Sequence, residues 1–490
     1  MATLRDAVTR LEGGRRSLDD LDPLTARTFV AERSAVYQDL VDALLRAGDG
    51  ASALLYAERL RVAELDGGGA SDDPREAGYR ALARRESRLL GALDQAEAAG
   101  DPERVAALTQ ELSDARVAFS RYVDELRTSY PDFDRLVRVD PTDLEAWQRE
   151  LGPGEVVLQP IVLPDRLAVL VFSAGPLVYR DVAVTEEELT KRVGRVLRVM
   201  RSRRLSNPER LEAHLDALGG WLWAPVADQL KDAKTIIVAP AGPLRYLPFQ
   251  LLRHEGSYLV EKHDVVNVTN VGSLKRRAGD GLHFTGDGLL AFANPDGTLP
   301  AADREVDALA TLFPGAAVAH RADATRATLS ALAPGRSVLH LATHGVLDAS
   351  APERSYIVLA ADEASPEGRL GYLDIPGLYS ALQDTALVVL SACETAVPLA
   401  PEGDAVQGGG LEIAGLANQF RRAGVPRLLA SLWQVSDEST QSLMVRFYEG
   451  LGEGRSPPAA LAAAQRSLMA RPETAHPFHW APFVLIGTPR

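Results

Sequence analysis

Two residues with nucleophilic or acid–base chemistry each follow an apolar run of the sequence. His344 comes directly after residues 337–343, and Cys393, the only cysteine of the 490-residue chain, comes shortly after residues 386–391. A thiol attacks a carbonyl as the thiolate, and its ordinary pKa of roughly 8.5 leaves it mostly protonated near neutral pH. A nearby imidazole can accept that proton and later donate it to a leaving amine. His344 and Cys393 therefore predict a Cys–His site for acyl transfer.

An acyl-transfer site also needs backbone N–H groups that face the developing oxyanion. Gly345 directly follows His344 in the sequence. A glycine lets the backbone approach a substrate without an intervening Cβ atom. We expect the N–H groups of Gly345 and Cys393 to be the two donors.

Each candidate also has a purely structural interpretation. A lone cysteine after an apolar strand is often an inert, buried hydrophobic residue, and a histidine at a strand end is often a hydrogen-bonded structural residue. A zinc site at His340 and His344 fits the sequence poorly, because the metallopeptidase pattern needs a helix and a glutamate where this chain has Leu341. We expect His340 to be a packed strand residue, and we predict no metal site and no cofactor.

The elements that must position these residues alternate between strands and helices after residue 150. Short apolar runs separated by Gly, Pro and Asp predict strands, and longer stretches with helical spacing predict helices. The predicted strands lie at residues 155–163, 167–172, 177–184, 235–239, 289–293, 337–343, 356–360, 386–391 and 427–432. The predicted helices lie at residues 186–204, 304–313, 325–333, 411–423, 438–450 and 458–470. This alternation predicts an α/β fold with helices on both faces of the sheet and functional residues at the carboxyl ends of strands.

Residues 1 to about 150 have a different character, because Ala, Leu, Arg and Glu dominate them. Apolar residues recur at three- and four-residue spacing, as in the stripe of Val36, Leu40, Leu44 and Leu45, which predicts about four or five helices. Paired helices of this length can be repeat modules of the tetratricopeptide sort, but we see no clean self-similar period and assign no repeats. We interpret this region as an all-α N-terminal domain that binds a partner or regulates the rest of the chain.

The composition is that of an ordinary globular protein, with 46% hydrophobic residues. Lys plus Arg number 53 and Asp plus Glu number 67, and the resulting charge of −14 argues against a general nucleic-acid binder. The length suggests about two or three domains. We see neither a long apolar span nor a secretory signal, so we expect a cytoplasmic protein with no membrane segment. The single cysteine excludes an intramolecular disulfide framework.

The two segments also resemble the signature motifs of a known family. His-Leu-Ala-Thr-His-Gly at 340–345 and Ser-Ala-Cys-Glu-Thr at 391–395 are similar to the two motifs of the CHAT-domain family. The members of this family are caspase-like cysteine peptidases, which are related more distantly to separase. The similarity continues in order at residues 240–244, 247–249, 259–261, 412–416, 420, 423–425, 431–437, 443–444, 447–448, 460–461, 464–465 and 479–483. The resemblance covers about residues 150–488 and implies a caspase-like sheet.

The resemblance implies roles for parts of the chain and for single residues. A silent caspase-like half at residues 151–300 would precede a catalytic half at residues 301–490. His344 would be the general base and acid, and Cys393 the nucleophile. Residues 398–410 resemble the mobile loop after the nucleophile in caspase-like enzymes, and we expect this loop to become ordered, or to be cut, on activation.

The resemblance also implies an acidic specificity pocket. Asp437 corresponds to the acidic residue that pairs with a substrate arginine in separase-like peptidases, and a buried Asp can hold a guanidinium bidentately. Glu394 can add to that negative field, and we include Trp433 in the substrate-binding set. Two structural interpretations stay open: Asp437 precedes a predicted helix and can serve as its N-cap, and Glu394 can cap a solvated turn.

The sequence thus predicts a cysteine endopeptidase that cleaves a protein substrate after a basic residue, Arg, and is regulated at its N-terminal helices by an activator or other protein. The main alternative is a non-catalytic scaffold that uses the helices and the CHAT-like domain for docking. A third interpretation is another acyl-transfer or thiol reaction on the same pair. The presence of both His344 and Cys393 favours an enzyme, because a silent copy could lose either residue with little harm to packing.

Overall fold

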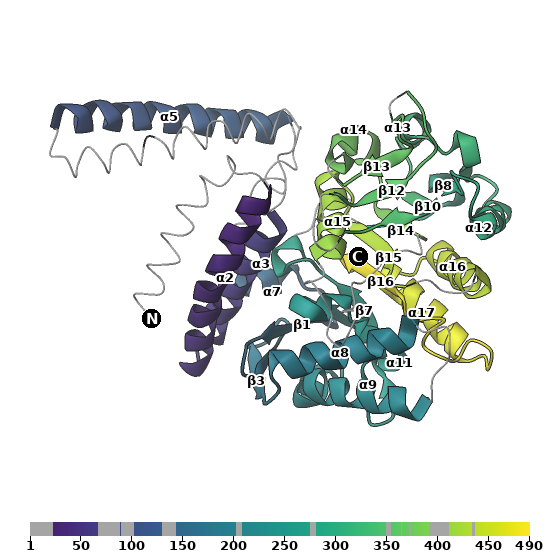
Figure 1. Ribbon diagram of the computed structural model, residues 1–490, viewed down its shortest axis with the longest axis horizontal. Helices are drawn as coiled ribbons and strands as arrows, with labels where there is room; N and C mark the ends of the chain where they lie inside the picture. The colour runs from purple at the N-terminus through teal and green to yellow at the C-terminus, as the bar shows by residue number, and fades with distance from the viewer. Residues whose placement is uncertain are drawn as a thin grey trace. The chain divides into compact units, whose positions relative to one another are not determined.

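A computed structural model provides the structure of the chain (Figure 1). It describes residues 23–66, 89, 102–129, 144–201, 208–274, 281–348, 354–363, 365–372, 374–391, 411–433 and 437–490. The chain forms two compact units, Met1–Pro141 and Thr142–Arg490. In the part of the chain so described, no helix is long and apolar enough to cross a membrane.

The described part of the first unit is helical, as the sequence predicts. Its helices are α2 Pro23–Arg46, α3 Gly50–Asp66 and α5 Pro102–Ser129. Helices α2 and α3 pack against each other, and Leu40, Leu44 and Leu45 of the predicted apolar stripe are buried. Gly48, with a φ of 78°, ends α2. The carboxylate of Asp49 then accepts a hydrogen bond from the N–H of Ser52 and so caps α3.

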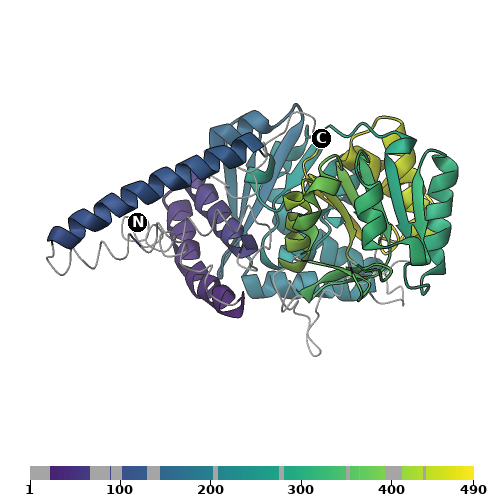
Figure 2. The ribbon, with the colours of Figure 1, turned by 90° about the horizontal axis from the view of Figure 1, so that it is seen from above.

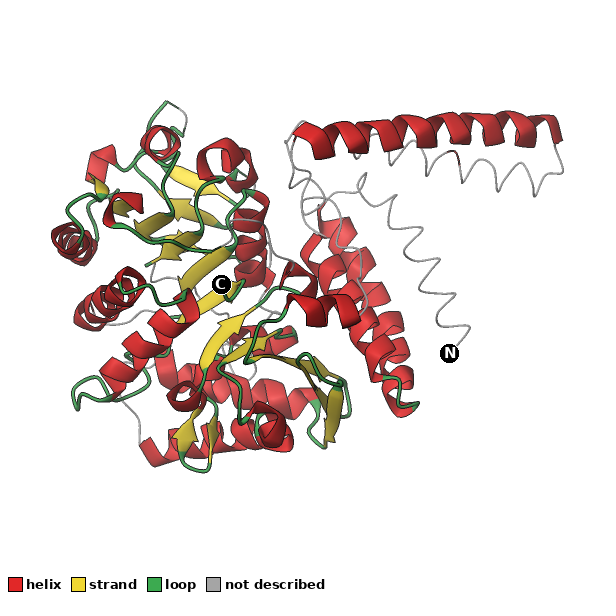
Figure 3. Cartoon of the chain, turned by 180° about the vertical axis from the view of Figure 1, so that it is seen from behind, coloured by secondary structure: helices red, strands yellow, loops and turns green. Residues whose placement is uncertain are grey.

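An 11-stranded sheet forms the centre of the second unit (Figures 1 and 3). Its strands in chain order are β1 Glu155–Val162, β2 Leu167–Phe172, β3 Val178–Val182, β4 Thr235–Val238, β7 Asp264–Asn267, β8 Leu289–Ala293, β9 Ala317–His320, β10 Val338–Ala342, β14 Leu387–Leu390, β15 Arg427–Ser431 and β16 Phe483–Gly487. Their order across the sheet is β3-β2-β1-β4-β7-β16-β15-β14-β10-β8-β9. Most of these strands are buried along their whole length, which explains their continuously apolar sequences.

Strand direction divides the sheet into two groups that meet at β16. Strands β9, β8, β10, β14 and β15 are parallel to one another, and β16 is antiparallel to β15. On its other side, β16 is parallel to β7, β4 and β1. The carboxyl ends of β8, β10 and β14 therefore lie next to one another at one edge of the sheet.

Helices cover both faces of the sheet, which confirms the predicted α/β class. The helices of the second unit are α7 Leu144–Glu150, α8 Glu186–Arg201, α9 Pro208–Leu222, α10 Ala227–Leu230, α11 Leu259–Lys262, α12 Pro300–Leu312, α13 Arg326–Leu332, α14 Tyr379–Leu382, α15 Leu411–Arg422, α16 Asp437–Gly452 and α17 Pro457–Met469. Helices α12, α16 and α17 lie on one face, and α15 lies on the other (Figures 1 and 2). Two small sheets accompany the large one: β11 Gly345–Val346, β12 Tyr356–Val358 and β13 Arg369–Gly371 form the first, and β5 Arg253–His254 and β6 Ser257–Tyr258 form the second.

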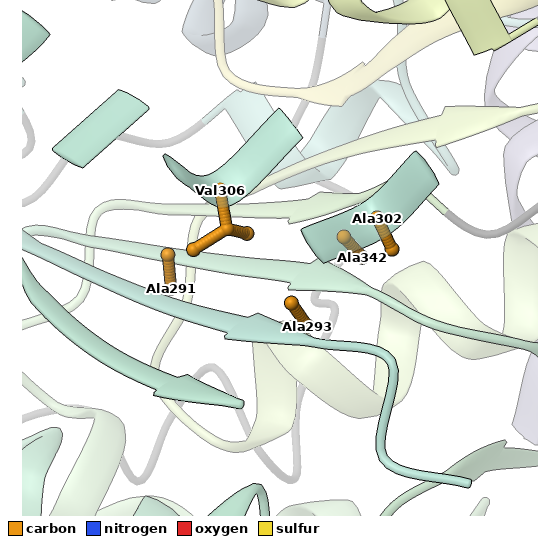
Figure 4. Close-up of a cluster of buried hydrophobic side chains, with 5 residues drawn as sticks. All are labelled: Ala291, Ala293, Ala302, Val306 and Ala342. Carbon is orange, nitrogen blue, oxygen red and sulfur yellow. The ribbon is translucent and has the colours of Figure 1, made fainter. Parts of the chain in front are cut away.

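Small side chains bring α12 close to the strands that lead to the candidate site. Ala291 and Ala293 of β8 and Ala342 of β10 face Ala302 and Val306 of α12 in a fully apolar cluster (Figure 4). Close packing of such small residues leaves the helix little freedom to shift. The loop between β8 and α12 is therefore fixed at both ends.

Candidate active site

The candidate site lies at the carboxyl ends of β8, β10 and β14. Leu341 of β10 pairs with Phe292 of β8 on one side and with Leu390 of β14 on the other. The ladder continues past both strand ends, because Asn294 and Ser391 each donate a backbone hydrogen bond to a carbonyl of β10, at Ala342 and Leu341 respectively. The loops that follow all three strands thus begin in a fixed register.

His344 follows β10 and lies partly open to solvent, with 24% of its side chain exposed. Its Nε2 atom is 2.7 Å from the hydroxyl oxygen of Thr298 and 3.8 Å from Oδ2 of Asp296. Thr298 in turn donates its hydroxyl proton to Oδ1 of Asp296 at 2.8 Å, and its N–H donates to the same oxygen at 3.1 Å. The histidine is therefore hydrogen-bonded to a short polar loop that the sequence analysis did not select.

The carboxylate in that loop is ionised. Partial burial acts to raise the pKa of Asp296, but the hydrogen bonds from the side chain and backbone of Thr298 and the nearby His344 act in the opposite direction. The net result is a pKa below the ordinary value for an aspartate. Asp296 therefore places a negative charge next to the His344 ring at neutral pH.

Asn294 organises this loop. It is fully buried and has a φ of 51°, a left-handed conformation that asparagine tolerates better than most residues. Its side-chain amide donates to Asp303 of α12 at 2.8 Å, and its side-chain oxygen accepts from the N–H of Leu299 at 2.7 Å. The backbone carbonyl of Asn294 accepts from the N–H of Gly297 at 3.1 Å. These bonds close the loop that carries Asp296 and Thr298.

Gly345 is buried and begins β11. It pairs with Ile357 of β12, and the N–H of Val358 donates to the carbonyl of His344 at 2.9 Å. This pattern makes Gly345 and Ile357 a non-hydrogen-bonded antiparallel pair, in which the N–H groups of both residues point away from the opposite strand. The N–H of Gly345 is thus directed away from β12, as an oxyanion donor requires.

A buried polar network lies beneath these loops. The hydroxyl of Ser391 donates to Oε2 of Glu305 at 3.1 Å, and Oε1 of Glu305 is 3.1 Å from Nε2 of His340. Nδ1 of His340 is 3.1 Å from the hydroxyl of Tyr448 on α16. Burial, and secondarily the Glu305 charge, raise the pKa of Tyr448 well above its ordinary value, so that it stays a neutral phenol. His340 is fully buried in β10, as predicted.

The sequence matches one family over more than half of its length. The model of the CHAT domain matches residues 212–488. The chain belongs to the CHAT-domain family. This finding confirms the resemblance seen in the two sequence motifs, both of which fall inside the matched residues.

Two solved structures of the Saccharomyces cerevisiae separase–securin complex are similar to this CHAT-domain chain, each with 10% sequence identity and a TM-score of 0.48. The alignments cover 99% and 96% of this chain, and 40% and 38% of the matched chains. The chain thus spans about two fifths of the length of the chains it matches. A comparison with the curated proteins finds no match.

The remaining predicted residues of the CHAT domain have different positions in the structure. Trp433 is 2% exposed, and its indole N–H donates to the carbonyl of Phe478 at 3.2 Å, so it faces the protein interior. Helix α16 begins at Asp437, but its side chain lies outside the described part of the structure. Cys393, Glu394 and residues 398–410 also lie outside it. Their roles stay predictions.

The sequence held a signal for three residues that contact or support the site, namely Asn294, Asp296 and Gly297. Asn-Pro-Asp-Gly at 294–297 directly follows the predicted strand at 289–293, and both halves of this tetrapeptide are turn signals. A polar turn at a strand's carboxyl end is a favoured place for functional residues. Thr298 and Glu305 have no comparable signal. The described part of the CHAT domain holds no group of three or more His, Cys, Asp or Glu residues that could bind a metal.

Proposed function

We propose that this chain is a cysteine endopeptidase in which Cys393 is the nucleophile and His344 is the general base and acid. The observation that carries this proposal is the register of two neighbouring strands. Leu341 of β10 pairs with Leu390 of β14, and His344 and Cys393 each follow their paired residue by three positions. Adjacent strands are about 4.8 Å apart. Because His344 and Cys393 lie the same number of residues beyond a paired position, this register favours a close approach of their side chains.

The proposed reaction begins with transfer of the Cys393 thiol proton to the His344 imidazole. The thiolate adds to the substrate carbonyl carbon, and the N–H groups of Gly345 and Cys393 stabilise the oxyanion. The carbon–nitrogen bond then breaks, and the imidazolium gives its proton to the departing amine. Water, deprotonated by His344, attacks the thioester, and the acid product and the thiol are released. The direction of the Gly345 N–H away from β12 supports this arrangement.

The proposed specificity is for a substrate with a basic residue, Arg, before the cleaved bond. Asp437 would bind its guanidinium, and Glu394 would add negative charge next to the nucleophile. Trp433 would support the pocket from the interior, where its indole binds the carbonyl of Phe478.

We also propose that the N-terminal helices regulate the peptidase through a protein partner. The unit Met1–Pro141 lies outside the residues that match the family, and its described part consists of helices and the short turn between α2 and α3. A site-specific cleavage sequence inserted between residues 130 and 143 would separate the two units of the purified full chain. A faster reaction of Cys393 with iodoacetamide after the cut supports a latent enzyme, and an unchanged rate contradicts this role.

The pH dependence of Cys393 alkylation tests the proposed chemistry. Because the chain has one cysteine, mass spectrometry of the intact protein reads this site alone. We expect rapid labelling by iodoacetamide well below the ordinary thiol pKa of about 8.5 in the wild type. His344→Ala should abolish the rapid labelling, whereas His283→Ala, at an exposed histidine, should not change it.

Cleavage of a peptide panel then tests the reaction itself. We expect hydrolysis of peptides at the bond that follows an internal Arg, and its loss in Cys393→Ala and in His344→Ala. Two results together would contradict the peptidase proposal and favour the scaffold alternative. The first is an ordinary thiol pH profile that is equal in wild type and His344→Ala, and the second is no peptide cleavage by either the intact chain or the chain cut between its two units.

A further inference from the structure

We propose that Thr298 and Asp296 are positioning residues for His344. In this arrangement they hold the proton of the neutral imidazole on Nε2, so that Nδ1 is the nitrogen that exchanges a proton with the nucleophile. The inference rests on the proposed peptidase function for its catalytic meaning. The tautomer itself is a property of the protein alone and can be measured without any substrate.

The count of protons between the three side chains leads to this tautomer. An ionised carboxylate only accepts hydrogen bonds, and a threonine hydroxyl has one proton. That proton goes to Oδ1 of Asp296, 2.8 Å away, because otherwise two acceptors would face each other at that distance. The Thr298 oxygen, 2.7 Å from Nε2 of His344, must then accept a proton from the ring. A neutral His344 therefore has Nε2–H and a lone pair on Nδ1.

The loop is built to hold this geometry. Both Asp296 and Thr298 are exposed, so without support their side chains would be free to turn into solvent. The buried Asn294 at the start of the loop holds it in place through two hydrogen bonds. Its side-chain amide donates to Asp303 on α12, and its side-chain oxygen accepts from the N–H of Leu299 at the end of the loop. Gly297, with a φ of 76°, allows the tight turn between them. The packing of α12 against β8 fixes both ends of this loop (Figure 4).

The same contacts also fit the ring after it has accepted a proton. When Nδ1 takes the thiol proton, the ring keeps its Nε2–H bond to Thr298, and the Asp296 carboxylate lies 3.8 Å from the same nitrogen. The ring can therefore accept and return a proton at Nδ1 without breaking its contact with the loop.

Nitrogen NMR of the full chain labelled with ¹⁵N-histidine tests the tautomer. Comparison with His344→Gln assigns the His344 signals among the nine histidines. In the neutral state we expect Nε2 to have the shift of a protonated nitrogen and Nδ1 that of an unprotonated one. Thr298→Ser should preserve this pattern, and Thr298→Val should give a mixture of tautomers. A wild-type Nδ1–H form, or no change in Thr298→Val, overturns the proposal.

The labelling rate of Cys393 tests the effect on the nucleophile. We expect Thr298→Val and Asp296→Asn to raise the midpoint of the labelling pH profile by about one unit, which is about tenfold slower labelling below the midpoint. Thr298→Ser should stay close to the wild type, as should Thr311→Val, a control on the exposed side of α12. Equal profiles for Thr298→Val and Thr298→Ser overturn the positioning role.

The two measurements separate this inference from the peptidase proposal. An Nε2–H tautomer that depends on Thr298, found together with an ordinary thiol profile in the wild type both before and after the cut between the two units, supports the histidine geometry and contradicts the peptidase. A reactive, His344-dependent Cys393 together with the other tautomer supports the peptidase and overturns the role of Thr298 and Asp296.

Discussion

The hydroxyl of Ser391 donates a hydrogen bond of 3.1 Å to the buried carboxylate of Glu305. Ser391 stands two residues before Cys393 in the sequence, and Glu305 lies on α12. The bond therefore connects the end of β14 to the helix whose preceding loop holds His344. One helix thus supports the segments that lead to both members of the proposed catalytic pair.

Loss of the Glu305 carboxylate should destabilise the second unit strongly. Glu305 is 5% exposed and lies 3.1 Å from Nε2 of His340, which is itself fully buried. Removal of the Glu305 carboxylate leaves the Ser391 hydroxyl without its acceptor, and an unsatisfied buried polar group costs about 1–3 kcal/mol. We expect a loss of this size for Glu305→Ala in urea unfolding of the full chain. The exposed Thr311→Ala on the same helix should change the unfolding free energy by less than about 0.5 kcal/mol.

The outcome for Glu305→Ala separates two views of the network. A loss as small as that of Thr311→Ala would mean that water replaces the carboxylate freely, and that the network does not hold α12 on the sheet. A large loss, reduced in Glu305→Gln, would mean that hydrogen-bonding capacity matters more than the charge.

Asn294 should tolerate glycine better than alanine. Both variants lose the hydrogen bonds to Asp303 and Leu299, but only alanine must also adopt a φ of 51°. A left-handed conformation costs a residue with a Cβ atom about 1–2 kcal/mol. We expect Asn294→Ala to be about 1 kcal/mol less stable than Asn294→Gly in thermal or urea unfolding. Equal stabilities would show that the loop abandons the left-handed turn once the side chain is lost.

One buried and two partly buried histidines should make the protein less stable in mild acid. Burial lowers the pKa of His263, His476 and His479 below the ordinary value. As the pH falls through about 6.5, the unfolded chain takes up protons that the folded chain does not accept until the pH reaches the lower folded pKa. Stability is thus lost in that window, by up to about 1.4 kcal/mol per pH unit for each histidine.

Urea unfolding between about pH 7.5 and pH 5.5 checks this pH dependence. We expect His263→Asn to reduce the slope of unfolding free energy against pH, because the side chain at this position would no longer titrate. His283→Asn, at an exposed histidine, should leave the slope unchanged. A free energy of unfolding that rises as the pH falls from about 7.5 to 5.5 in the wild type would contradict the lowered pKa values.

Asp437 should control the preference for arginine. A hydrogen bond to a charged group contributes about 1.5–3 kcal/mol, so its loss corresponds to about a ten- to hundredfold change. We expect Asp437→Asn to lower kcat/KM for cleavage after Arg by this factor. The neighbouring, exposed Glu438→Gln serves as the matched control and should have little effect. Similar losses in both variants would show a general effect of charge rather than a specific pocket.

Local sequence patterns predicted much of the second unit. The strands at residues 167–172 and 289–293 have the predicted bounds, because continuous apolar runs suit strands that are buried on both faces. The positions of His344 and Gly345 just beyond a strand were likewise predicted from the run that precedes them. Strands β7, β9 and β16 were not predicted. In β7, polar residues at both ends leave an apolar run of only two residues, which is too short to indicate a strand.

The sequence by itself determined the residue types, the strand that leads to each candidate and the family motifs. Only the tertiary structure decided which side chains meet. Thr298 and His344 are 46 residues apart, and Ser391 and Glu305 are 86 residues apart. Such contacts depend on the order β14-β10-β8 within the sheet and on the packing of α12 over it. Strand order is a property of the whole chain, because it is set by how all the apolar surfaces are buried together, and no local pattern encodes it.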